Sequence, residues 1–253
     1  MKFNTNFQQL QPKLSVPYGV QQQPTRRPIV VFCLPGYSFT PGFFDSWTRF
    51  LLMSKNFPFD IVVSRHYSPV IFHCRANLLG ADNRAGKHQM PFQGKIPYDY
   101  IMWLDSDIVW QPEQILALYN RMQNDKSIEV LCGIYLTTSG THSTIVKDWD
   151  VNYFLKTGMF PFLTPQQLKE EANKNPKKLA EVFYAGMGCM MCRRGAIEKV
   201  TYPWFEPVMH EIEISKDFSS EDVSLCWKWN KAGVKIYVDP DIIVGHEKST
   251  IIR

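Results

Sequence analysis

The stretch YIMWLDSD, residues 100–107, joins an apolar segment to a pair of carboxylates. Its first five residues are apolar and rich in strand formers, which predicts a buried β-strand. Asp105 and Asp107 then place two oxygen ligands where the chain leaves the core. Such ligands suit a divalent cation that carries a diphosphate. The triplet is equally compatible with an ordinary polar turn, because Asp and Ser are common turn residues.

The composition is that of an ordinary globular protein with a modest positive charge. The chain has 253 residues, of which 45% are hydrophobic and 21% charged, and its formal net charge is +4. This length fits one sizeable domain or two small ones. Lysine and arginine occur in scattered pairs instead of tracts, so nucleic-acid binding is not predicted, whereas an anionic small substrate is compatible. No apolar run reaches ~18 residues and no signal pattern begins the chain, so no transmembrane segment is expected.

The six cysteines lie mostly inside apolar stretches. This is typical of free, buried thiols in a reducing compartment, and we therefore expect a cytoplasmic protein. Cys189 and Cys192 have the spacing of a CxxC motif, but no second pair of cysteines or histidines accompanies them. The two methionines between them favour a strand interior over a zinc or redox site.

The chain divides into a polar extension, residues 1–27, and one domain, residues 28–253. The extension is rich in glutamine and proline, which predicts a poorly ordered lead-in or a strap over the surface. In the domain, apolar strand patterns alternate with amphipathic helix patterns as far as residue 135, which predicts a mainly parallel sheet with crossover helices. The expected strands are 29–34, 60–64, 99–104, 129–135, 181–193 (interrupted by glycines), 234–238 and 242–244; the expected helices are 43–53, 72–83, 112–124, 166–181 and 221–232.

The segment Ser219–Asp222 begins the last of these helices. Serine before a helix, followed by acidic residues in its first turn, is sound capping chemistry, so the segment is compatible with a helix start and nothing more. The first turn of a helix also directs side chains towards any cavity above the sheet. Asp222 would then be a general base for a substrate hydroxyl within hydrogen-bond reach.

His246 follows Gly245 at the end of the last apolar strand. A lone histidine in such a place is usually packed or exposed without a role. The glycine, however, lets the backbone approach another group closely, and a neutral imidazole is able to complete an oxygen-rich metal site.

These motifs occur in an order that resembles a known family. The ordered set is similar to GT-A glycosyltransferases, close to the family 2-like enzymes of bacteria, phages and large viruses, over roughly residues 28–250. The resemblance implies an α/β fold: a single Rossmann-like domain with a mainly parallel central sheet flanked by helices. The motifs that carry it are DSD (105–107), YAGMGC (184–189) with RR (193–194), PWF (203–205), SEDVSLC (220–226) with AG (232–233), VDP (238–240) and GH (245–246).

The resemblance implies a metal site and a catalytic base. Asp107 would be the principal ligand of Mn²⁺ or Mg²⁺, and Asp105 would reach the ribose, or the metal through water. His246 would complete the metal site. Asp222 would be the base of an inverting reaction, and Glu221 would support it or bind the acceptor.

The resemblance also implies sites for a nucleotide-sugar donor, by default a UDP-sugar, and for a glycan or other hydroxyl acceptor. Pro35 and Gly36 would begin the nucleotide pocket, to which Arg75 and Ser106 would contribute. Gly188 would leave room for the donor sugar, and Trp204 would form a wall on the acceptor side. Aromatic residues at 149, 204 and 205 are candidates for stacking on sugar rings, although core packing is the more common role of such residues.

The same motifs are compatible with three further kinds of protein. A nucleotidyltransferase or phosphohydrolase would want a glycine-rich loop with lysine after the first strand, and LPGY at 34–37 supplies none. A retaining glycosyltransferase would carry the same motifs, as would a degenerate member that only binds sugars or proteins. The segment 147–180 is longer than a minimal family core needs and is expected to shape the acceptor site, while the loop 83–94 is a candidate for a flexible lid.

Overall fold

The computed structural model describes residues 26–213 and 215–248. The extension predicted for residues 1–27 therefore lies outside the described residues, apart from its last two. These two arginines hold the start of the domain, because Arg26 pairs with Asp99 at 2.8 Å and Arg27 pairs with Asp60 at 3.0 Å. No helix in these two ranges is both long and apolar enough to cross a membrane.

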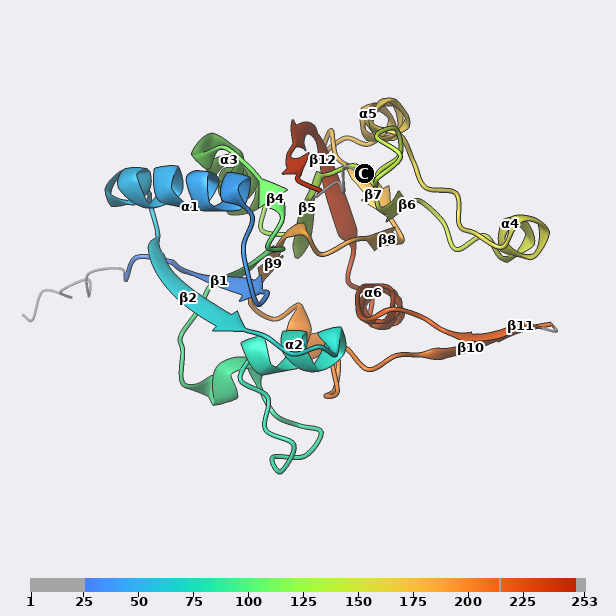
Figure 1. The fold of residues 1–253 in the computed structure, drawn as a ribbon, viewed down its shortest axis with the longest axis horizontal. Helices are drawn as coiled ribbons and strands as arrows, with labels where there is room; N and C mark the ends of the chain where they lie inside the picture. Colours follow the sequence, from blue (N-terminus) through green and yellow to red (C-terminus); the bar gives the residue numbers. More distant parts are fainter. Residues whose placement is uncertain (1–25, 214, 249–253) are drawn as a thin grey trace, which may run out of the picture.

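A seven-stranded sheet forms the centre of the molecule (Figure 1), in the order β2-β1-β3-β9-β5-β12-β7. Five of these strands point the same way, whereas β9 and β7 run antiparallel to their neighbours. The sheet is thus mainly parallel, as predicted. Its strands are β1 (Ile29–Pro35), β2 (Asp60–His66), β3 (Tyr100–Leu104), β5 (Val130–Ile134), β7 (Ala180–Val182), β9 (Cys189–Arg193) and β12 (Ile236–Ile243).

Helices cover both faces of this sheet. Alternate side chains of β1 enter two separate apolar clusters, Val31 and Cys33 in one, Val30 and Phe32 in the other. Burial on both faces explains why the central strands read as continuous apolar runs. The first cluster includes residues of α2 (Ile71–Leu78), α5 (Pro165–Lys174) and α6 (Glu221–Lys231); the second includes residues of α1 (Pro41–Met53) and α3 (Pro112–Asn124).

The segments between the main helices and strands contain short elements that the sequence patterns did not predict. An antiparallel hairpin, β10–β11, and helix α4 extend together from one side of the sheet, beside α6 (Figure 1). Two-residue strands pair as β4 with β13 and as β6 with β8. These elements are β4 (Ile108–Val109), β6 (Ile145–Val146), α4 (Val151–Thr157), β8 (Tyr184–Ala185), β10 (Met209–Ile212), β11 (Ser215–Phe218) and β13 (Gly245–His246), with 3₁₀ turns η1 (Ser54–Asn56), η2 (Pro91–Gly94) and η3 (Ile197–Lys199).

Several predicted boundaries were wrong. The helix expected over 72–83 ends at Leu78, before the positive-φ residue Gly80, and the helix expected over 166–181 ends at Lys174. The stretch 181–193 is not one strand but contains parts of three: β7 and β8 are separated at Phe183, and the turn with Gly186 and Gly188 separates β8 from β9. The two strands expected at 234–238 and 242–244 are one strand with a register shift between Val238 and Ile243. The cysteines among the described residues are all free and buried, as expected.

Candidate active site

A cleft of about 390 Å³ opens where β1 and β3 end and α6 begins. In open α/β sheets, ligands bind outside the carboxyl ends of the parallel strands, so this is the expected place for a substrate. The cleft gathers most of the predicted site residues from four distant segments. It is lined by Pro35, Gly36, Tyr67, Ser68, Ile71, Cys74, Arg75, Asp105, Ser106, Asp107, Glu221 and Asp222.

Arg75 on α2 joins two of the predicted carboxylates at the floor of the cleft. Its Nε donates to Oε1 of Glu221 at 3.0 Å, and its Nη2 donates to Oδ1 of Asp105 at 3.1 Å. Only 3% of Arg75 is exposed, and its guanidinium lies over the ring of Trp103. Burial alone would lower the pKa of Arg75, but the two carboxylates hold it above the ordinary value. The side chain therefore stays charged and fixes Asp105 and Glu221 relative to each other.

Asp222 lies in the first turn of α6 and is held by hydroxyl groups. Its Oδ2 accepts a hydrogen bond of 2.8 Å from the Tyr184 hydroxyl, and its Oδ1 accepts one from Ser220. Ser220 is the N-cap residue of α6, and its hydroxyl bonds to Asp222 instead of capping the helix backbone. Burial and the charge of Asp222 raise the pKa of neighbouring Glu221. The hydroxyl groups of Tyr184 and Ser220 thus fix the orientation of the Asp222 carboxylate at the start of α6.

His246 meets Asp107 because β13 pairs antiparallel with β4, the strand that directly follows Asp107. The Nε2 atom of His246 lies 3.3 Å from Oδ2 of Asp107, and its Nδ1 lies 2.7 Å from the carbonyl oxygen of Leu136. A carbonyl only accepts, so Nδ1 carries a proton, and in the neutral ring Nε2 presents its lone pair towards Asp107. Lys248 also binds this carboxylate, with Nζ 2.6 Å from Oδ2.

The pair Asp107 and His246 fits a cation that is shared with a substrate. A carboxylate oxygen and an imidazole nitrogen at this separation can bind one ion, and a histidine held by a carbonyl at Nδ1 is the usual arrangement of a metal ligand. Among residues 26–213 and 215–248, no group of three or more His, Cys, Asp or Glu side chains is placed to hold a metal. The protein would supply two ligands, and diphosphate oxygens and water would supply the others, as is common for Mg²⁺.

Gly36 allows the turn after β1 to approach the Asp105–Asp107 turn. A Cβ atom at Gly36 would lie 2.8 Å from Cβ of Ser106, closer than two such atoms approach. The amide of Thr40, just beyond this turn, donates to the carbonyl oxygen of Ser106 at 3.0 Å. The glycine therefore keeps one wall of the cleft close to the two aspartates.

Three predicted residues do not line the cleft. His246 lines a neighbouring cavity and reaches Asp107 from there, whereas Trp204 and Gly188 are buried. Trp204 has no exposed surface and packs against Tyr202, so the prediction that it walls the acceptor site was wrong. Gly188 is buried, and a Cβ there would lie 2.8 Å from the ring of Tyr135. Its lack of a side chain accommodates this tyrosine, whose hydroxyl accepts the Gly188 amide at 3.1 Å, and a role towards the donor sugar stays a prediction.

Sequence reasoning assigned no role to Tyr184 or Lys248, although both contact predicted site residues. Tyr184 lies within a quoted motif, but nothing in that motif says which distant carboxylate its hydroxyl meets. Lys248 stands two residues after His246. In an extended segment, side chains two residues apart lie on the same side, so the sequence could have indicated that Lys248 lies beside His246.

A family comparison matches the middle of the chain. Residues 94–201, a little under half of the chain, match the family model described as Glycosyl transferase family 2. This part of the chain is therefore similar to family 2 glycosyltransferases. The mixed α/β architecture, with a mainly parallel central sheet between helices, is the one that the resemblance to GT-A enzymes predicted. The matched segment includes β3, the Asp105–Asp107 turn and β9.

Similar solved structures share little sequence with this chain. The protein A197 from STIV is 16% identical, with a TM-score of 0.47 over 89% of this chain and 97% of its own. Glucosyl-3-phosphoglycerate synthase from Mycobacterium tuberculosis, in complex with Mn²⁺, UDP and glucosyl-3-phosphoglycerate, is 14% identical, with a TM-score of 0.39 over 88% of this chain and 73% of its own. With TM-scores below 0.5, these likenesses say nothing about the substrates here. No curated protein matches the sequence significantly.

Proposed function

We propose that this glycosyltransferase moves a sugar from a nucleoside diphosphate sugar, by default a UDP-sugar, to a hydroxyl acceptor, with a divalent cation and with inversion. One observation carries the proposal. Asp105, Asp107 and Asp222 line the same cleft, although they come from two distant segments of the chain. The cleft thus places groups suited to a diphosphate beside a group suited to accept a proton.

The proposed diphosphate end is Asp107, which lines the cleft, together with His246 and Lys248, which line the neighbouring cavity and contact Asp107 from there. A bound Mn²⁺ or Mg²⁺ would supply stabilisation of the negative charge that develops on the departing diphosphate. Asp107 and His246 would hold this ion, since Oδ2 and Nε2 lie 3.3 Å apart. Lys248 adds a positive charge beside them that is free to pair with phosphate oxygens as well as with Asp107.

The acceptor end of the cleft is formed by the first turn of α6. Asp222 takes the proton of the acceptor hydroxyl as that oxygen attacks the anomeric carbon from the side opposite the diphosphate. Tyr184 and Ser220 orient its carboxylate. Arg75 holds the adjacent Glu221, and with it the start of the helix, against β3. One carboxylate thus acts as base, while the other positions it.

A donor-hydrolysis assay tests the proposal. Purified protein with Mn²⁺ or Mg²⁺ is incubated with a panel of UDP-, GDP- and dTDP-sugars, and nucleoside diphosphate release is measured with and without EDTA. We expect slow, EDTA-sensitive release from one donor, and inverted configuration at the anomeric carbon when an acceptor is found. Silence across the whole panel would support a sugar-binding protein instead, and a product of retained configuration would refute the role of Asp222 as base.

A further inference from the structure

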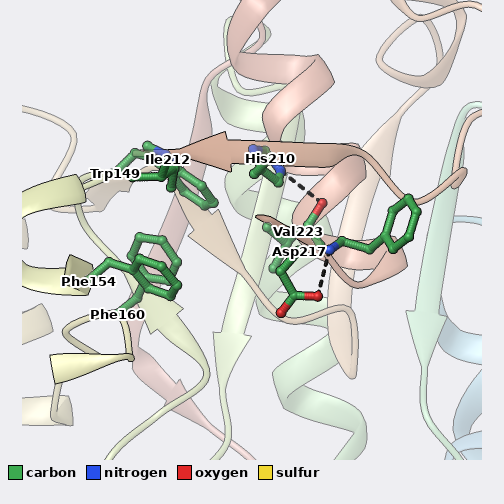
Figure 2. Close-up of a pocket in the computed structure, with 9 residues that line it drawn as sticks. Trp149, Phe154, Phe160, His210, Ile212, Asp217 and Val223 are labelled. Atoms are coloured by element: carbon green, nitrogen blue, oxygen red, sulfur yellow. Dashed lines mark hydrogen bonds between the residues drawn. The ribbon is translucent and has the colours of Figure 1, made fainter. Parts of the chain in front are cut away.

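A second cavity, of about 150 Å³, lies between the α4 region and the β10–β11 hairpin. Figure 2 shows Trp149, Phe154 and Phe160 gathered on one side of it, with His210 and Ile212 on β10 beside them and Val223 of α6 opposite. An apolar cavity of this size accommodates one six-membered ring, since cavities of roughly 150 Å³ lined by apolar side chains bind benzene.

The lining of this cavity, which we call the aromatic pocket, favours an apolar ring. The ring centroid of Trp149 lies 4.3 Å from that of Phe160 and 5.1 Å from that of His210. Two polar side chains at the pocket already have partners within the protein. His210 Nε2 lies 3.1 Å from Ser219 Oγ, and Asp217 Oδ1 accepts the amide of Phe218 at 2.7 Å. A pyranose buried here would leave hydroxyl groups unpaired at a cost, whereas a phenyl-like ring would not.

The aromatic pocket shares a wall with the catalytic cleft. Val223 lines the pocket, and the preceding residue, Asp222, lines the cleft. Consecutive Cα atoms are about 3.8 Å apart, so a molecule seated in the pocket lies within a few ångströms of the first turn of α6. The amide of Val223 also donates to Oδ1 of Asp222 at 2.8 Å. The two cavities are therefore neighbours across one helix turn.

We infer that the aromatic pocket binds the apolar ring of the acceptor, and that the acceptor is a hydroxyl compound with an aromatic or similarly sized apolar group. This inference rests on the proposed function. The hydroxyl oxygen of the seated acceptor forms a bond to the anomeric carbon of the donor, the bond from that carbon to the diphosphate oxygen breaks, and the hydroxyl proton passes to Asp222.

Two glucosides that differ only in their apolar group test the pocket. Phenyl β-glucoside and methyl β-glucoside are titrated into the protein, and binding is followed by calorimetry and by NMR. We expect the phenyl compound to bind at least about tenfold more tightly, because the pocket removes its apolar ring from water. Equal affinities would overturn the inference.

A pair of phenylalanine variants locates the binding. Phe218 is 61% exposed at the pocket, and Phe44 is 66% exposed on α1, which packs on the other face of the sheet, so neither truncation threatens the fold. Phe218→Ala is expected to lower the affinity for phenyl β-glucoside several-fold, whereas Phe44→Ala is expected to leave this affinity unchanged. An unchanged affinity in Phe218→Ala, or an equal loss in both variants, would overturn the assignment.

Nucleotide release connects the pocket to the reaction. With a donor that the wild type cleaves, phenyl β-glucoside is expected to raise the rate of nucleotide release because it accepts the sugar. A lower rate, as from a compound that only displaces water, would overturn the acceptor role. Methyl β-glucoside is expected to change the rate little, and a rate indifferent to bound phenyl glucoside would overturn the acceptor role. The two failures are distinguishable: uncleaved donors refute the proposed function, whereas cleaved donors with no phenyl preference refute the aromatic pocket.

Discussion

The Nε2 atom of His246 lies 3.3 Å from Oδ2 of Asp107, and the pairing of β13 with β4 brings the two residues together. In that ladder His246 stands opposite Ile108, the residue after Asp107. The proposed metal site therefore depends on a backbone pairing of only two residues on each side. The backbone of Asp107 also stabilises this pairing, because its carbonyl oxygen accepts a hydrogen bond of 2.8 Å from the amide of Glu247.

Removing either proposed metal ligand should weaken metal-dependent nucleotide binding. Asp107→Asn and His246→Ala are each expected to weaken UDP binding in the presence of Mn²⁺ by at least about tenfold, since even outer partners of metal ligands typically contribute 10–100-fold. Calorimetry with and without EDTA measures this effect. Asp45→Asn, an exposed aspartate on α1, is the matched control. Affinity that stays the same in both ligand variants would rule out the site.

Lys248 competes with a cation for Asp107. Replacement by methionine removes a positive charge whose Nζ lies 2.6 Å from Oδ2. We expect Lys248→Met to bind Mn²⁺ alone about fivefold more tightly, which corresponds to the ~1 kcal/mol typical of exposed ion pairs. The electron paramagnetic resonance signal of free Mn²⁺ reports the affinity. Lys235→Met, which removes a lysine paired with Glu181 far from the site, should have no effect. Weaker Mn²⁺ binding in Lys248→Met would contradict the competition.

Asp222→Asn should abolish transfer while leaving the nucleotide bound. A positioned general base typically contributes 10²–10⁴-fold, and asparagine cannot accept the proton but preserves the shape of the side chain. We expect kcat to fall by about this factor and the affinity for UDP to change by less than about threefold. Turnover near that of the wild type would exclude Asp222 as the base.

The Arg75 network should be a major stabilising element of the site. Arg75→Met leaves Glu221, which is 8% exposed, and Asp105 without their shared cation. Breaking a buried ion pair from one side typically costs about 3–5 kcal/mol, so a loss of this size in the free energy of unfolding is expected. The double variant Arg75→Met/Glu221→Gln should recover part of it, because no buried charge is then unpaired on that side.

Arg84→Met provides the comparison for this loss, because its side chain is 90% exposed and pairs with Asp82 on the surface. Denaturant unfolding should leave this variant indistinguishable from the wild type. If Arg75→Met also left the free energy of unfolding unchanged, the Arg75 network would not stabilise the site.

Glu221 should make stability depend on pH. Burial and the charge of Asp222 raise its pKa above the ordinary value of 4.5. The folded state therefore binds the proton of the Glu221 carboxyl more tightly than the unfolded state does. The resulting contribution to the free energy of unfolding is fully present below pH ~4.5 and is lost as the pH rises through the raised pKa of the folded state. Relative to Glu221→Gln, the wild type should lose stability across this window in urea unfolding at stepped pH. If the difference in the free energy of unfolding between the wild type and Glu221→Gln did not vary with pH, the raised pKa of Glu221 would be refuted.

The strand patterns of the sequence were enough to predict the sheet. Residues 100–104 are apolar without interruption because β3 is covered on both faces, and the same cause made 29–34 and 129–135 recognisable. The predicted ends of helices were wrong where the sequence pattern of a helix continued beyond the residue at which the helix ends. Charged residues after Lys174 still read as helix, although the chain turns there towards β7.

The sequence by itself determined that an apolar strand ends in two aspartates and that a helix begins with Glu221 and Asp222, because burial and capping leave their marks on neighbouring residues. Only the tertiary structure decided which distant groups meet. Arg75 joins Asp105 to Glu221, Lys248 reaches Asp107, Tyr184 reaches Asp222, and Trp204 turns inward. These outcomes depend on strand order and helix packing, and periodicity along the chain reports the face on which a side chain lies but not the partner it finds there.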